Sequence, residues 1–221
     1  MSLKLTNLVG FGGGGGSAIA VIDDGGDDDF KNTTIHTYTS RTCTGPACYI
    51  SVGWISDTVE RNLNSMTFNG NTISIKVQRH RAAGIVWHAC AIGVISGAQS
   101  GNLVFNFSGT VTSSYYRLLS ARNVRNTNPT DTDSYSSDTN SITLSALIPP
   151  SSGGLEIAAM VLDDTLLPVT WTPSPEVKTL FDGAPDARWS VAYRLGGLGG
   201  SGDIKWTAAG DNQATVGVAL R

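Results

Sequence analysis

The sequence predicts an all-β fold, specifically a two-sheet antiparallel sandwich of the jelly-roll or immunoglobulin-like kind with a glycine-rich N-terminal arm. The first observation behind this prediction is compositional. Charged residues make up 15% of the 221 residues, against roughly 25% in an average globular domain. Long helices need Glu and Lys on their exposed faces, whereas strands accept Thr and Ser there. The second observation is that short alternating apolar segments separated by turn residues follow one another from residue 32 onward, without a helical period.

The first thirty residues differ from the rest and are interpreted as a flexible glycine-rich and acidic segment, with the sandwich domain spanning residues 31–221. Five consecutive glycines at residues 12–16 leave the backbone too free for a regular element to cross them. Before them lies an apolar strip that is too short to form a core of its own. We expect this strip to contact another subunit, although an edge strand in its own sheet is the open alternative; it contains Leu3, Leu5, Leu8, Val9 and Phe11.

The first group of predicted strands covers residues 49–55, 64–68, 72–77, 84–95 and 103–107. Asn69-Gly70 separates two of them and is a strong hairpin signal, because both residues tolerate a positive φ. Residues 84–95 are apolar on both faces, which is typical of a central strand covered twice. The side chains expected in the core are Ile85, Trp87, Phe105 and Trp189.

The second group of predicted strands covers residues 113–124, 141–146, 155–162, 169–172, 189–195, 204–208 and 214–220. Residues 125–140 between the first two are rich in Asn, Thr, Asp and Ser. Such a long stretch predicts an exposed loop that is mobile or functional.

The three cysteines suit a protein made in a reducing cytoplasm. Cys90 lies in an apolar run and is interpreted as a small core residue. Cys43 and Cys48 bracket a Gly-Pro turn and are expected to lie close enough to bridge; a disulfide is expected only outside a cell, and two free thiols are preferred in a reducing compartment.

The sequence contains no motif that indicates catalysis, and we expect neither enzymatic activity nor a cofactor. His36, His80 and His88 are not spaced as metal ligands. Asp57, Glu60 and Glu156 are the carboxylates that a glycosidase could use, but Glu156 falls at the solvent-facing phase of its strand. The tryptophans are interpreted as core residues, with at most one acting as a platform for sugars; they are Trp54, Trp87, Trp171, Trp189 and Trp206.

An acidic cluster between residues 23 and 29 is a weak candidate for a metal site, since Ca²⁺ binds several carboxylates on a loop. Its spacing does not match a calcium-binding loop, so a solvated acidic turn is the preferred interpretation. The cluster consists of Asp23, Asp24, Asp27, Asp28 and Asp29.

A net charge of −3 gives no basic surface for nucleic acid, and no apolar run is long enough for a membrane helix. We therefore expect neither nucleic acid nor a membrane as a partner.

Several segments between residues 37 and 221 resemble small β-sandwich proteins encoded in the structural gene clusters of tailed phages and prophages. The resemblance rests on sheet-packing and turn patterns, and it does not extend to the first thirty residues. The matching features are Gly53-Trp54 with Arg61, residues 65–70, residues 85–89, residues 104–110 and residues 169–172.

This resemblance implies a virion part and supplies no catalytic residue. The leading hypothesis is a capsid decoration or cement subunit, made in the host bacterial cytoplasm, located in the virion, and oligomeric there with other capsid or tail proteins. The alternative is a receptor- or glycan-binding module of a tail or head fibre, which would bind host glycans through residues 125–140. A polysaccharide hydrolase is the third possibility.

Overall fold

The computed structural model describes residues 6–8, 19–84, 86–124, 128–129, 131–137, 141–144, 154–163, 169–172, 177–183, 187–196, 204–207 and 213–220. None of these residues lies in a helix, and the strands pair antiparallel throughout. The all-β sandwich prediction is therefore confirmed. Within the described residues, no helix is long and apolar enough to cross a membrane.

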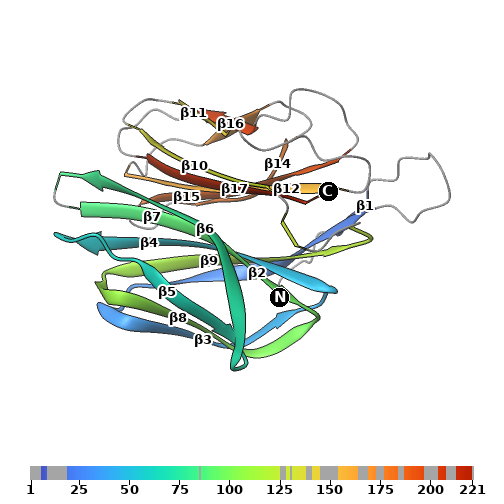
Figure 1. The fold of residues 1–221 in the computed structure, drawn as a ribbon, viewed down its shortest axis with the longest axis horizontal. Helices are drawn as coiled ribbons and strands as arrows, with labels where there is room; N and C mark the ends of the chain where they lie inside the picture. The colour runs from blue at the N-terminus through green and yellow to red at the C-terminus, as the bar shows by residue number, and fades with distance from the viewer. Residues whose placement is uncertain are drawn as a thin grey trace.

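The first half of the chain forms one continuous nine-stranded sheet that bends back on itself (Figure 1). The strand order is β1-β2-β9-β4-β7-β6-β5-β8-β3, and β6 pairs with β7 along most of its length and with β5 at its start. The strands are β1 (Thr6–Leu8), β2 (Ala20–Asp29), β3 (Thr33–Cys43), β4 (Ala47–Asp57), β5 (Leu63–Phe68), β6 (Asn71–Ala83), β7 (Val86–Ser96), β8 (Gln99–Val111) and β9 (Ser113–Arg122).

The second half forms two further sheets, with the orders β10-β17-β12-β15-β14 and β11-β16-β13. Figure 1 shows them stacked above the first half as two more layers. The strands are β10 (Asp131–Ser137), β11 (Ser141–Leu144), β12 (Leu155–Leu162), β13 (Thr170–Thr172), β14 (Val177–Gly183), β15 (Arg188–Leu195), β16 (Ile204–Thr207) and β17 (Gln213–Leu220).

The same strand order occurs twice in the chain. In the first half, the neighbouring strands of one layer are β2-β9-β4-β7-β6, and those of the other layer are β3-β8-β5. When β2–β9 are renumbered one to eight, these orders become 1-8-3-6-5 and 2-7-4. Counting β10–β17 in the same way gives the same two orders. The chain thus contains two units of like topology, β2–β9 (the first unit) and β10–β17 (the second unit). The expected single two-sheet sandwich is corrected to two sandwiches packed together.

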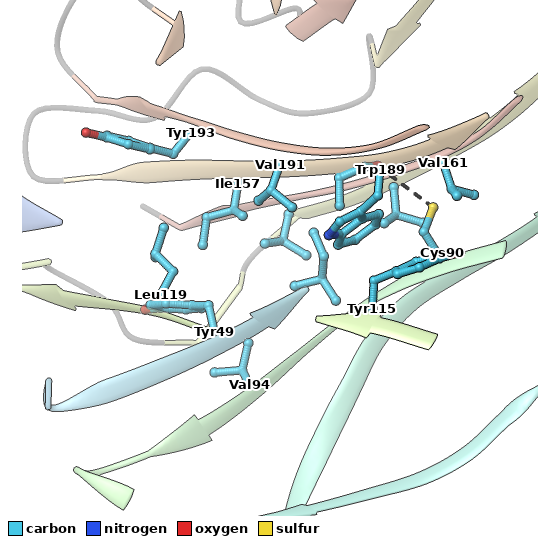
Figure 2. Close-up of a cluster of buried hydrophobic side chains, with 14 of the residues drawn as sticks. Tyr49, Cys90, Val94, Tyr115, Leu119, Ile157, Val161, Trp189, Val191 and Tyr193 are labelled. Carbon is cyan, nitrogen blue, oxygen red and sulfur yellow. Dashed lines mark hydrogen bonds between the residues drawn. The ribbon is translucent and has the colours of Figure 1, made fainter. Parts of the chain in front are cut away.

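An apolar layer, here called the seam, joins the two units. The first unit contributes side chains from β2, β4, β7 and β9, and the second unit contributes them from β12, β15 and β17. Figure 2 shows Tyr49 and Leu119 facing Ile157 and Val191 across it. The thiol of Cys90 also donates across the seam to a backbone oxygen of the second unit, at 3.3 Å from Sγ.

Each unit also has an interior of its own. In the first unit Trp54, Phe105 and Leu103 are fully buried between its two layers. In the second unit Trp206, Met160 and Leu144 fill the corresponding space. The strands facing the seam are therefore buried on both faces, as the runs of buried residues in β4, β12 and β17 show.

Two local predictions are confirmed. Asn69 and Gly70 form the turn between β5 and β6 with φ values of 50° and 80°. Strand β7 lies between β4 and β6, and residues 89–95 within it are all buried. Phe105 and Trp189 are core residues as expected, with exposed fractions of 0% and 1%. Trp87 is only half-buried because it lies near the start of β7 at the rim of the sheet, and Ile85 falls outside the described residues.

The boundary expected after residue 30 is corrected, because residues 20–29 form strand β2 inside the first unit. This strand pairs with β9 along its length, and a bulge near Gly25 interrupts the register. Gly25 has a φ of 95°, which glycine adopts without strain. The sequence of β2 looks like a flexible acidic turn, but most of its carboxylates have partners on neighbouring strands and connections.

The loop expected at residues 125–140 contains strand β10, which pairs with β17 in the second unit. Its Asp, Thr and Ser residues alternate on a half-exposed edge strand, where polar side chains meet water. Strands β3 and β14 were likewise not among the predicted segments. Both are also last in their sheets, so less of their surface needs to be apolar.

We expect the Phe105→Ala substitution to lower the free energy of unfolding by about 3–5 kcal/mol, because it leaves a cavity inside the first unit. Phe30→Ala is the matched control. Phe30 is 53% exposed, and its ring meets the edge of Tyr115 at 6.3 Å between centroids. Losing that contact should cost about 1 kcal/mol. Equal losses in chemical denaturation of the two variants would contradict the assignment of Phe105 to the core.

Candidate functional site

The five acidic residues of β2 are distributed along an extended strand, and all but Asp28 have separate side-chain partners. Asp23 accepts a hydrogen bond from Arg117 Nε at 2.8 Å and another from Nη2 of the same guanidinium. Asp24 accepts hydrogen bonds from Thr44 Oγ1, at 3.1 Å, and from Ser120 Oγ. These contacts tie β2 to β9 and to the turn that follows β3.

The remaining partners come from β3 and the β2–β3 connection. Asp27 accepts a hydrogen bond from Arg41, and Asp29 lies 3.5 Å from Lys31 Nζ and 3.4 Å from His36 Nδ1. Successive side chains of a strand point to opposite faces, so these carboxylates do not converge on one point. In the described part of the chain, no group of three or more His, Cys, Asp or Glu residues could hold a metal ion. The weak metal-site candidate therefore has no support from the geometry.

A pocket of about 250 Å³ opens where β2 and β9 of the first unit face β15 of the second. Residues 26–28 and 115–117 line it together with Trp189. Figure 2 shows Tyr115 and Trp189 reaching toward each other from the two units. Sequence reasoning missed this pocket, because its walls come from three segments that only the packing of the units brings together.

The pocket has an aromatic interior and a charged rim. Tyr115 and Trp189 are only 2% and 1% exposed, whereas Asp27 and Asp28 are exposed. Gly26 leaves room for the strand to approach its neighbour, since a Cβ there would lie 2.2 Å from the Tyr116 carbonyl oxygen. A chain with any larger residue at position 26 would have to move β2 away from β9.

Cys43 and Cys48 form a disulfide across the turn between β3 and β4, with their Cα atoms 6.1 Å apart. Both residues are fully buried in the interior of the first unit. Cys90 is a free, buried thiol, and burial raises its pKa, so it has little thiolate character.

The N-terminal apolar strip is only partly described. Leu8 lies in β1, which pairs with β2 at the edge of the first unit's sheet, so three residues of the strip region belong to the chain's own sheet. Leu3, Leu5, Val9 and Phe11 lie outside the described residues.

Glu156 is not at the surface, contrary to expectation. Its exposed fraction is 0%, and its Oε2 lies 2.7 Å from Nε of Arg194, which is also buried. The two residues are paired across β12 and β15, on the face that covers the interior of the second unit. The physical reason is that each charge compensates the other directly across the strand pair. A signal was present in the sequence, because β12 is otherwise apolar and carries Glu156 as its one charge, while β15 carries the cations Arg188 and Arg194.

The other carboxylates considered for catalysis are not near this pair. Glu60 lies at the surface of the first unit, 3.5 Å from His80 Nδ1, and Asp57 is exposed at the end of β4. The structure does not bring Glu156 together with either residue. The two-carboxylate arrangement of a glycosidase is thus not formed by these three residues.

Three of the four buried tryptophans have a hydrogen-bond partner for the indole N–H. Trp54 donates to the Arg61 carbonyl at 2.8 Å. Trp171 and Trp206 each donate to a side-chain hydroxyl at 2.9 Å. Nε1 of Trp189 is buried and has no hydrogen-bond partner among the described residues. Among these four, Trp189 is also the one that lines the pocket.

All three histidines are largely enclosed by protein, and burial lowers the pKa of each below its ordinary value of 6.5. Nearby carboxylates oppose this shift but do not overcome it; they are Asp29 for His36, Glu60 for His80 and Asp163 for His88. The folded protein therefore keeps these imidazoles neutral at a pH where an unfolded chain would protonate them.

Comparison with known proteins adds no identification: no protein-family model, curated protein or solved structure matches this chain.

We expect Arg194→Met to destabilise the protein by about 3–5 kcal/mol, because it leaves the Glu156 carboxylate buried without its cation. The double variant Glu156→Met with Arg194→Met should recover most of this loss, since both charges are then replaced by apolar side chains of similar length. Chemical denaturation of both single variants and the double variant measures the coupling. Additive losses would show that the pair does not interact.

We expect the melting temperature to be constant above about pH 7 and to fall as the pH drops below about 6.5. In that range the unfolded chain binds protons that the folded histidines resist, so acid favours unfolding. The His88→Gln variant should show a shallower decline between about pH 7 and pH 5, whatever its absolute stability. An identical slope in the variant would contradict a lowered pKa for His88; calorimetry over a pH series makes the comparison.

Proposed function

We propose that this chain is a virion structural protein that decorates a phage capsid as a cement subunit, with each of its two units a jelly roll. The observation that carries the proposal is the strand order that occurs twice, in which the first and last of eight strands lie side by side in one layer and the second and seventh lie side by side in the other. Jelly rolls of eight strands recur in viral capsid proteins and lectins. The resemblance to phage structural proteins favours the capsid over the lectin role.

The construction of the chain suits a particle surface. The seam and the two unit interiors give the protein three apolar layers. The disulfide between Cys43 and Cys48 is of a kind that persists outside the cell. A decoration subunit needs this durability because it remains exposed after the host cytoplasm is lost.

Attachment is proposed to use the glycine-rich N-terminal arm, through Leu3, Leu5, Leu8, Val9 and Phe11. Strand β1 lies at the outer edge of β2, which supports this role because an edge strand can pair with a strand of a neighbouring subunit. Burying several of these side chains against capsid protein would contribute roughly 1.5–3 kcal/mol each. The partners in this proposal are other virion proteins, and the chain is oligomeric in the particle.

A glycan-binding module of a tail or head fibre is the second candidate, and the pocket at the seam is the observation that favours it. The two candidates differ in abundance, since a cement protein covers the capsid whereas a fibre has few copies. A polysaccharide hydrolase receives no support from the positions of Asp57, Glu60 and Glu156 described above.

The test is the amount and attachment of this chain in purified particles. We expect quantitative mass spectrometry to find a copy number of the same order as the major capsid protein. Capsids lacking the chain should bind it when it is added back. Replacing Leu3, Leu5 and Phe11 together by Ser should abolish this binding while leaving the melting temperature within about 4 °C.

The control is Val59→Ser, which changes an exposed apolar residue of the first unit, 47% exposed, and should bind capsids normally. A copy number limited to a few per particle would overturn the decoration proposal. Normal capsid binding by the triple serine variant would overturn the attachment role of the N-terminal strip.

A further inference from the structure

The pocket at the seam has the features of a small-molecule site at the junction of two units. Its volume of about 250 Å³ lies just below the usual range for ligand pockets, about 300–1,000 Å³. That size suits a ligand of about one sugar ring rather than a long chain. Junctions between structural units are a common position for such sites.

The charges around the pocket are mostly committed to protein partners. Arg117 is held by Asp23 through two hydrogen bonds, and Asp27 is paired with Arg41. Asp28 is different: it is exposed, and its carboxylate makes no hydrogen bond or ion pair within the described residues. The pocket therefore offers one uncommitted acceptor group and no uncommitted cation, which disfavours phosphate and other anions.

The inner wall of the pocket is aromatic and consists of Tyr115 and Trp189. The exposed fraction of Trp189 is 1%, and its indole N–H is buried and has no partner among the described residues. Buried tryptophans ordinarily satisfy this group, as the other three in this protein do. Tyr115 adds a second aromatic ring, whose hydroxyl is engaged with Ser113 Oγ at 2.9 Å.

We propose that this pocket binds a single neutral sugar unit, with Asp28 accepting hydrogen bonds from sugar hydroxyls and the rings of Tyr115 and Trp189 closing the apolar side. A neutral polyhydroxylated ring supplies the donors that Asp28 lacks, and it brings no charge next to the aromatic wall. This proposal is independent of attachment to a capsid, because the pocket residues are separate from the N-terminal strip.

The experiment uses the full chain labelled with ¹⁵N, and it follows the five tryptophan indole N–H signals by NMR. The probes are methyl glycosides of glucose, galactose, mannose and N-acetylglucosamine, each added at millimolar concentration. The Trp189 signal is assigned with a Trp189→Phe variant. We expect at least one glycoside to shift the Trp189 signal in a saturable manner while the Trp171 and Trp206 signals stay in place.

The matched pair of variants is Asp28→Ala and Asp57→Ala, which each remove one exposed aspartate from the first unit. Asp28→Ala should weaken glycoside binding by about tenfold or more, the effect of losing a hydrogen bond to a charged group. Asp57→Ala should leave it unchanged. Unchanged positions of the other indole signals report that both variants are folded.

The proposal is overturned if none of the glycosides moves the Trp189 signal, or if the two aspartate variants bind equally well. Methylammonium and inorganic phosphate serve as charged probes, and saturable binding of either one without glycoside binding also overturns it. These outcomes are separate from the particle experiment, which measures copy number and capsid attachment.

Discussion

The apolar seam between the two units is the contact on which the rest of this structure depends. It covers one face of the sheet containing β4 and β7 and one face of the sheet containing β12 and β15. The fit is close, since a Cβ at Gly53 would lie 2.7 Å from Cε3 of Trp189. Trp189 thus packs against the first unit, closes the seam and forms a wall of the pocket. Any movement of one unit against the other would change the pocket as well.

Electrostatic compensation decides where the charged residues can lie. Strand β2 tolerates most of its aspartates because Arg117, Arg41 and the hydroxyls of Ser120 and Thr44 donate hydrogen bonds to them. The buried Glu156 and Arg194 follow the same rule in a dry environment, where an isolated charge would be far more costly. In both cases the partner lies on an adjacent strand or connection and is distant in sequence.

This dependence on distant partners explains what the sequence could and could not predict. Local signals suffice for the Asn69-Gly70 turn and for the doubly buried β7, because the turn chemistry and the apolar run lie within a few residues. They fail for β2, whose Asp-Gly composition suggests a turn until Arg117 of β9 is placed beside it. They fail equally for the pocket, which needs Gly26, Tyr115 and Trp189 from two units. The twofold strand order was also hidden, since the two halves share topology without an evident sequence repeat.

The order of the units along the chain has a consequence for biosynthesis. All strands of the first unit precede those of the second in the chain. The complete first unit can therefore emerge from the ribosome before β12, β15 and β17 have been synthesised. Until then the face that carries Tyr49, Leu119 and Cys90 has no cover. Exposed apolar sheet surface promotes association between nascent chains. Rapid emergence and docking of the second half therefore shortens the time during which this face can associate with other nascent chains.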